Sequence, residues 1–67
     1  MSVAKVSEIS ATSGKSFEDA IRKGLARAHK TLRNVRGAWI KEQRVWVNKG
    51  EIKEYQVNMM VTFVIDD

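Results

Sequence analysis

The last third of the chain, residues 51–65, reads as one strand that is too long for a small domain. Every second residue from Tyr55 to Ile65 is apolar, whereas the positions between them are mostly polar. Side chains alternate faces along a strand, so this pattern indicates one buried face. Such a strand would span roughly 45–50 Å at about 3.3 Å per residue, against about 17–20 Å for a usual strand. It must therefore curve around another element or reach beyond its own subunit.

The chain is short for a domain that is stable by itself. Its 67 residues predict a single domain over residues 1–67, and a domain of this size buries little of its surface. Small domains usually add disulfides, a metal ion or oligomerisation. The sequence has no Cys and one His, which excludes a disulfide and disfavours a metal site within one chain. Oligomerisation is the stabilising device that remains.

The charge and hydropathy of the chain limit its possible binding partners and its cellular location. The net charge of +4 suits phosphorylated or acidic ligands and leaves nucleic acid open. No apolar stretch approaches the ~18 residues that span a membrane, and the N-terminal residues lack the apolar core of a signal peptide. The lack of Cys is compatible with the cytosol, and we expect a cytoplasmic protein without a membrane partner.

Two further strands are predicted. Residues 3–10 alternate imperfectly, as in a strand covered on both faces, and a polar loop follows over residues 11–15. Residues 38–47 alternate as a second strand, and a three-residue turn with Gly last, residues 48–50, joins it to the long strand. Asp66–Asp67 reads as an acidic tail. The predicted rows of the second strand are Trp39, Lys41, Gln43, Val45 and Val47 on one face and Ala38, Ile40, Glu42, Arg44 and Trp46 on the other.

One amphipathic helix is predicted between the first two strands. Ser16 is a suitable N-cap, and Asp19 lies at N3, where its side chain can return the capping bond. Apolar residues recur at helical spacing over residues 17–35, which indicates one buried stripe. We interpret Gly24 within this stripe as a point of close contact with the sheet. Gly37 is available for a left-handed or extended exit from the helix.

The predicted order is β-α-β-β, an α+β fold in which a three-stranded antiparallel sheet wraps around one helix. The apolar row of the long strand faces that helix. The other face is too apolar to be fully exposed to solvent, and we expect other subunits to cover part of it. From the long strand it carries Gln56, Asn58, Met60, Thr62 and Val64.

At this point the residues resemble the dodecins, small β-α-β-β proteins that bind flavin and assemble as hollow shells of twelve subunits. The resemblance covers nearly the whole chain and implies a homododecamer. Each matching segment is weakly specific alone, but their order and spacing in so short a chain are specific. The segments are Ala11-Thr12-Ser13, Ala20-Ile21, Leu25-Ala26-Arg27-Ala28, Lys30-Thr31-Leu32-Arg33, Lys41-Glu42, Glu54-Tyr55-Gln56-Val57 and Val61-Thr62-Phe63.

The resemblance implies a site for riboflavin or FMN on the sheet. In dodecins a Trp at the start of the second strand stacks on the flavin, and a Gln of the third strand bonds the ring edge. The Gln is present as Gln56, whose amide offers an acceptor and two donors to the isoalloxazine edge. The Trp position falls on Gly37, and Trp39 is the nearest stacking candidate. Arg44 matches an Arg that some dodecins place near the flavin phosphate.

Two further sites follow from the same resemblance and from symmetry. Arg27 and the run Thr31-Leu32-Arg33 match positions where some dodecins resemble binders of coenzyme A, and Arg suits phosphate. Symmetry could gather Glu42 carboxylates around an axis and bind a cation. We interpret Trp46, near the hairpin, as packing at an interface or at the solvent edge.

The resemblance implies storage or sequestration of flavin, and the sequence shows no sign of catalysis. It contains no nucleophile–base pair and no Gly-rich phosphate loop, so we expect no enzyme activity. The alternative is a shell of the same architecture that binds no flavin, because Gly37 replaces the stacking Trp, and that binds a cation, coenzyme A or another small ligand. A nucleic-acid-binding module is less favoured, because the sheet lacks paired stacking aromatics and acidic residues are scattered along the chain.

Overall fold

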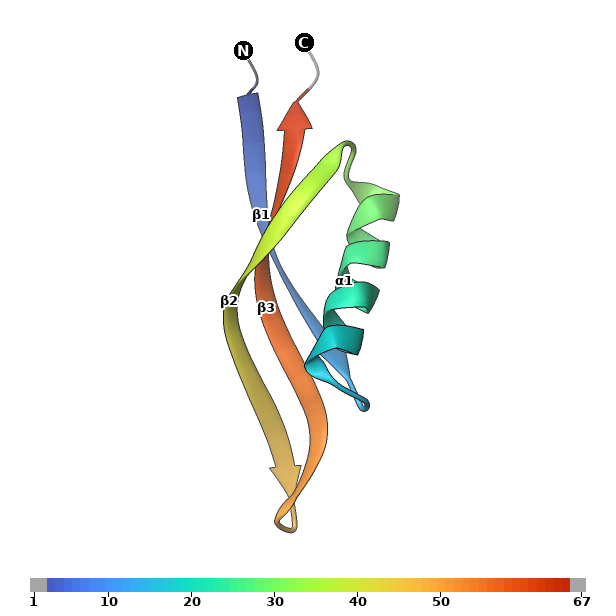
Figure 1. The fold of residues 1–67 in the computed structure, drawn as a ribbon, viewed down its shortest axis with the longest axis vertical. Helices are drawn as coiled ribbons and strands as arrows, with labels where there is room; N and C mark the ends of the chain where they lie inside the picture. The colour runs from blue at the N-terminus through green and yellow to red at the C-terminus, as the bar shows by residue number, and fades with distance from the viewer. Residues whose placement is uncertain (1–2, 66–67) are drawn as a thin grey trace.

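The computed structural model describes residues 3–65, and its elements follow the predicted order (Figure 1). They are β1 (Val3–Ser13), α1 (Phe17–Thr31), β2 (Val35–Asn48) and β3 (Glu51–Ile65). The strands form one antiparallel sheet in the order β1-β3-β2, so the long last strand lies at its centre. The predicted β-α-β-β fold, with a three-stranded antiparallel sheet around one helix, is confirmed. The predicted acidic tail, residues 66–67, lies outside the described residues.

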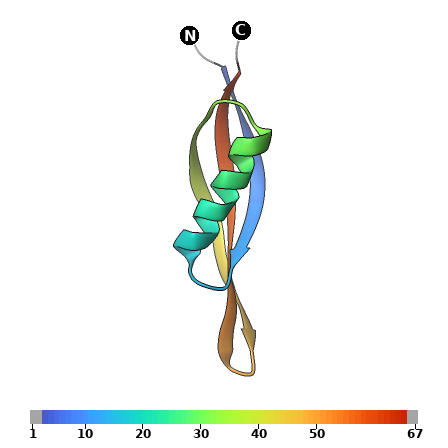
Figure 2. The ribbon, with the colours of Figure 1, turned by 90° about the vertical axis from the view of Figure 1, so that its right-hand side faces the viewer.

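The length of β3 gives the protomer its shape. The strand has 15 residues, and the longest dimension of the protomer is 51 Å. Both views show the sheet curving past α1 on one side, with the β2–β3 hairpin projecting beyond the helix (Figures 1 and 2). The strand therefore curves around the helix, the first of the two predicted alternatives, and its hairpin end extends beyond the core. Within residues 3–65 no helix is long and apolar enough to cross a membrane.

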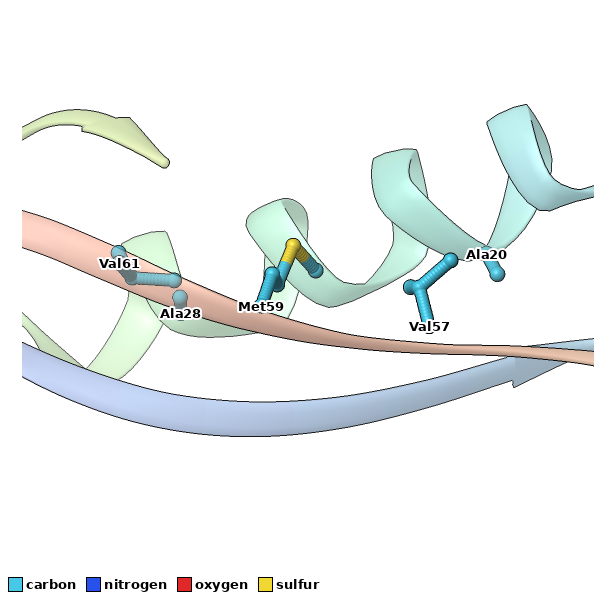
Figure 3. Close-up of a cluster of buried hydrophobic side chains, with 5 residues drawn as sticks. All are labelled: Ala20, Ala28, Val57, Met59 and Val61. Carbon is cyan, nitrogen blue, oxygen red and sulfur yellow. The ribbon is translucent and has the colours of Figure 1, made fainter. Parts of the chain in front are cut away.

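The core is a thin layer between β3 and the helix (Figure 3). Val57, Met59 and Val61 of β3 are fully buried against Ala20 and Ala28 of α1. These β3 residues belong to the row predicted to face the helix, and that prediction is confirmed. Small residues on the helix allow its backbone to approach the strand closely.

Gly24 continues this stripe of small residues, and a side chain at this position would force its neighbours to move. A β-carbon at residue 24 would overlap the Cε methyl group of Met59 and lie 3.0 Å from the Cβ of Ala11. The predicted close contact between Gly24 and the sheet is therefore confirmed.

A hydrogen-bonded cluster fixes the start of α1. Ser16 Oγ accepts from the Asp19 backbone N–H at 3.0 Å, as predicted for an N-cap. The Asp19 carboxylate does not return the bond to Ser16 but accepts from Ser13 Oγ at 2.5 Å, and Ser13 Oγ accepts from the Lys15 N–H at 2.9 Å. The bond from Ser13, aided by Lys23 at 3.3 Å, holds the pKa of Asp19 below its ordinary value.

The helix is shorter than predicted, and β2 begins earlier. Leu32 is extended, with φ −111° and ψ 138°, and its N–H closes the helix on the Ala28 carbonyl at 2.8 Å. Asn34 then takes the left-handed conformation, with φ 58°. The chain therefore turns away from the helix at Asn34 and not at Gly37. Val35 pairs with Phe63, which is why this apolar residue belongs to β2 and not to the helix.

Two other boundaries differ from the prediction. Residues 11–13 continue β1 instead of forming a loop, because they pair with residues 55–57 of β3. The hairpin turn contains two residues, Lys49 and Gly50, with φ of 54° and 78°, and Asn48 already pairs with Glu51. Positive φ at both central residues is the requirement of a two-residue type I′ turn, which follows the twist of the strands.

Candidate functional site

A bulge in β2 decides which side chains reach the open face of the sheet, which we define as the face opposite α1. Ile40 pairs with Met59 and Glu42 pairs with Asn58, so Lys41 is an extra residue in the ladder. An extra residue shifts the alternation of its strand by one position. The face rows predicted for the second strand are therefore wrong, because they assumed unbroken alternation.

The shift places the three predicted flavin residues of β2 on the open face with Gln56, together with two further residues of β2. Directly opposed residues of neighbouring strands share a face, and each of these residues is opposite a residue on the open face of β3. The predicted shared face of residues 37 and 39 is confirmed by their pairing with Thr62 and Met60. The open-face residues of β2 are Gly37, Trp39, Glu42, Arg44 and Trp46.

Gln56 is the centre of a hydrogen-bonded row across this face. Its Oε1 accepts from Trp46 Nε1 at 2.8 Å, and its Nε2 donates to Ser10 Oγ at 2.7 Å and to Asn58 Oδ1 at 3.4 Å. Asn58 in turn donates to Glu42 Oε1 at 3.1 Å. The row fixes the amide of Gln56, with its oxygen toward β2 and its nitrogen toward β1.

Arg44 and Trp46 form a stacked pair beside Gln56. The Cζ of Arg44 lies 4.3 Å from the centroid of the Trp46 ring, a cation–π contact. Arg44 is also the β2 residue directly opposite Gln56. The pair places a positive charge and a planar aromatic surface next to a fixed amide, which suits a planar ligand that carries an anionic group.

The structure separates the other two predicted flavin residues from Gln56. Trp39 lies opposite Met60 and Gly37 opposite Thr62, four and six residues along β3 from Gln56. At ~3.3 Å per residue these positions are about 13 and 20 Å away within one protomer. The structure therefore joins Gln56 to Arg44 and not to Trp39 or Gly37. A β-carbon at Gly37 would meet nothing within 4 Å, so the position has room for a side chain.

Sequence reasoning missed two participants in this row, Ser10 and Trp46. Ser10 was predicted only as a strand residue, and the signal for it is its position opposite Asn58 in the β1–β3 register. Trp46 was interpreted as packing near the hairpin. The signal was present in its spacing, because residues 44 and 46 of one strand share a face.

The predicted coenzyme A residues lie in the C-terminal half of α1 and directly after it. Arg27, Thr31 and Leu32 line a groove of about 540 Å³ between α1 and β1. Arg33 lies outside it, in a smaller hollow of about 320 Å³ that it shares with Thr31 and Leu32. The structure thus distributes the four residues over two adjoining hollows. Lys23 adds a second positive charge to the rim of the larger groove, whereas Glu8 adds a negative one.

Glu42, the predicted cation ligand, is a single carboxylate bonded to Asn58. Among residues 3–65 no three His, Asp or Glu side chains are grouped closely enough to hold a metal ion. A cation at Glu42 therefore requires carboxylates from other copies of the chain.

Known proteins similar to this chain point to one family. The family model for Dodecin matches residues 3–66. The chain is 40% identical to the dodecin of Thermus thermophilus over 65 residues, which cover 97% of this chain and 94% of that protein. A crystal structure of an arginine-to-alanine mutant of T. thermophilus dodecin has a TM-score of 0.94 at 39% identity and covers 100% of this chain and 98% of that chain. The calcium dodecin of Mycobacterium tuberculosis, a calcium-chelating antigen with a novel calcium-binding site, has a TM-score of 0.82 at 32% identity, covering 96% of this chain and 91% of that chain.

Proposed function

This chain belongs to the dodecin family, and from that membership we propose that it is a non-catalytic protein that stores or sequesters riboflavin or FMN. Dodecins are small binding proteins that form oligomers. The observation that carries the proposal is the amide of Gln56, fixed on the open face between Trp46 and Ser10 and directly opposite Arg44. A fixed amide beside a cation and an aromatic ring matches the polar edge, the charge and the flat surface of FMN.

We further propose that twelve copies of this single domain, residues 1–67, form a hollow homododecamer in the cytoplasm. Large apolar side chains at the projecting hairpin are uncovered in the protomer: Val47 is 59% exposed and Ile52 is 51% exposed. Trp39 on the open face is 53% exposed. Apolar surface of this extent favours burial by other subunits. Such a shell would surround the flavin with protein and limit its contact with solvent, which suits storage.

Titration of flavin fluorescence tests the flavin proposal. Riboflavin and FMN at fixed concentration lose fluorescence as the protein is added at micromolar concentration, because stacking on an aromatic side chain quenches the excited ring. Full retention of fluorescence for both ligands would refute the proposal. Bovine serum albumin at the same concentration controls for non-specific quenching.

A flavin-free shell is the second candidate, and two observations favour it. Gly37 provides no stacking surface where other dodecins have Trp, and the α1–β1 groove carries Arg27 and Lys23 on its rim. These cations suit the phosphates of coenzyme A. A cation held by Glu42 residues of several copies is the other possibility, and the calcium dodecin of M. tuberculosis is a relative that binds calcium.

Calorimetric titrations with coenzyme A and with CaCl₂ distinguish these ligands. Binding of coenzyme A that Arg27→Gln weakens would support the groove, and binding of calcium that Glu42→Gln abolishes would support a carboxylate site. We do not propose a nucleic-acid partner, because Glu8, Glu42 and Glu54 on the open face would repel a phosphate backbone.

A further inference from the structure

Trp46 is held in place on the open face although nearly half of it is uncovered. Its indole edge donates to Gln56 Oε1 at 2.8 Å, and the guanidinium of Arg44 lies 4.3 Å from its ring centroid. The residue is nevertheless 45% exposed. A side chain fixed by two contacts has already lost much of its rotamer freedom, so a ligand that stacks on it incurs little further ordering cost.

The contact with Arg44 shows what kind of group the indole accepts. A guanidinium is a planar cation, and it takes the same position over the ring that a planar ligand would take. Arg44 is exposed, so its long side chain can leave the indole when a ligand ring replaces it. A cation–π contact at an exposed site is weaker than a bidentate pair between Arg and phosphate. A ligand ring that carries a phosphate therefore compensates for the lost contact between Arg44 and the indole, because Arg44 then pairs with the phosphate. A ring without a phosphate compensates for it less.

The bonds already made by Gln56 define the ligand edge. Both hydrogens of its Nε2 are engaged, by Ser10 and Asn58, and one lone pair of its Oε1 accepts from Trp46. One acceptor lone pair remains. The amide in this arrangement selects a ring edge that donates an N–H, such as the imide N–H of an isoalloxazine.

The other aromatic side chain of the open face is less suitably placed. Trp39 lies opposite Met60, about 13 Å along the strand from Gln56 at ~3.3 Å per residue, and Gly37 is bare. Trp46 is therefore the aromatic residue in direct contact with the fixed amide.

We propose that Trp46 is the stacking surface of the site, and that with Gln56 and Arg44 it binds a planar ring with an N–H edge and a phosphate tail, FMN in preference to riboflavin. The inference rests on the proposed flavin function and adds to it a residue that the family resemblance does not supply. It moves the stacking surface from residue 37 to the β2–β3 hairpin.

Single-tryptophan variants test this assignment, because the chain has only two tryptophans. Trp39→Phe leaves Trp46 as the sole tryptophan, and Trp46→Phe leaves Trp39; excitation near the red edge of tryptophan absorption excludes Tyr55. On titration with FMN, the emission of the Trp39→Phe protein falls with the same midpoint as the flavin signal. In the Trp46→Phe protein the emission of Trp39, about 13 Å from Gln56, also falls by energy transfer to bound FMN, but at a higher midpoint, because Phe gives a smaller stacking surface. Free tryptophan titrated with FMN corrects for absorption of the light by the ligand.

Alanine variants give the corresponding affinities. Trp46→Ala weakens FMN binding about tenfold, which corresponds to a loss of ~1.4 kcal/mol, and Trp39→Ala, the matched control, changes it by less than about twofold. An unchanged affinity in Trp46→Ala, or a loss confined to Trp39→Ala, would overturn the assignment of Trp46 while leaving flavin binding intact. A parent protein that binds neither flavin removes both the proposed function and this inference. If Trp46→Ala does not assemble, the midpoints of the two phenylalanine variants decide, and equal midpoints would overturn the assignment.

Discussion

Gly24 of α1 lies so close to Met59 of β3 that a β-carbon at residue 24 would overlap the Met59 Cε methyl group. This contact lies at the centre of the core, between the buried residues Ala20 and Ala28. It allows the helix to lie close to the central strand, so that the sheet can curve around it. The open face, with Gln56, is the other side of the same strand. The candidate site therefore lies on the face of β3 opposite its contact with the helix.

We predict that Gly24→Ala destabilises the protein. Overpacking costs about 1–3 kcal/mol, which exceeds the roughly 1 kcal/mol that Ala gains over Gly within a helix, and we expect a net loss of about 1 kcal/mol. Because oligomer stability depends on protomer concentration, the thermal midpoint is compared at one fixed concentration. In the double variant Gly24→Ala/Met59→Val, the shorter side chain at residue 59 makes room for the added β-carbon. The double variant therefore loses less stability than the sum of the losses of the two single variants. A higher midpoint for Gly24→Ala alone would contradict the packing.

Ser13→Ala should change how the free energy of unfolding depends on pH. The bond from Ser13 holds the pKa of Asp19 below its ordinary value of 3.8. A carboxyl whose pKa is lower in the folded state stabilises the fold above its unfolded pKa, and this contribution is lost as the pH falls through the folded pKa. Ser13→Ala is therefore less stable than the parent at pH 7, and the difference narrows below about pH 4.

Thermal midpoints of the parent and Ser13→Ala between pH 7 and pH 3 measure this effect. Lys15 and Lys23, which also favour the charged form of Asp19, keep their charge over this range. Ser10→Ala is the matched control, because Ser10 bonds Gln56 and not a carboxylate. A stability difference for Ser13→Ala that stays constant with pH would be evidence against the Ser13–Asp19 linkage.

Gly37→Trp tests the stacking position of other dodecins against Trp46. With the ring on Trp46, about 20 Å along the strand, the flavin affinity changes by less than about threefold, whereas a gain of about tenfold would show that the ring lies at residue 37. The position is exposed on the open face, and a side chain there meets no neighbouring atom of the protomer within 4 Å. An added stacking partner contributes about 0.5–1.5 kcal/mol beyond its buried area. Fluorescence titration with riboflavin and FMN measures the affinity.

The matched control for this variant is Ala38→Trp, the next residue of β2. Ala38 pairs with Val61, so its side chain lies on the helix side of the sheet. Equal gains in both variants would mean that the effect of Gly37→Trp is non-specific. Flavin binding by Gly37→Trp but not by the parent would favour the flavin-free shell.

Arg44→Gln should weaken the binding of FMN more than the binding of riboflavin. If Arg44 pairs with the phosphate, its loss weakens FMN binding by about tenfold, in line with ~1.5–3 kcal/mol for a hydrogen bond to a charged group reduced by exposure. Riboflavin, which has no phosphate, loses less than about threefold. Arg36→Gln is the control, because Arg36 is an exposed arginine of β2 distant from Gln56. Equal losses for both flavins would show that Arg44 does not recognise the phosphate.

The predictions that depended on periodicity were reliable, and those that depended on single residues were less so. The alternation of β3 predicted its buried row, and the helical stripe predicted the contact at Gly24, because a repeated pattern averages over local exceptions. The end of α1 depended on one position: a left-handed or extended exit was predicted at Gly37, and Asn34 takes the left-handed conformation instead. Asn tolerates this conformation better than most residues do.

The candidate site was only partly predictable, because the bulge at Lys41 leaves no clear mark in the sequence. Without it, Trp39 and Arg44 fall on opposite faces, and with it they share the open face. The pairing of Gln56 with Trp46 depends on the same register. A shift of one residue reverses every side chain beyond it, so strand faces predicted from alternation alone fail at a bulge.

Native mass spectrometry of the protein with FMN reports both assembly and bound ligand in one spectrum. We expect a species of twelve 7.6 kDa chains whose mass increases by whole numbers of FMN molecules, with less FMN retained by the Trp46→Ala protein. A protein that stays free of FMN at every ligand concentration, whatever its assembly, would show that this chain is not a flavin-binding dodecin.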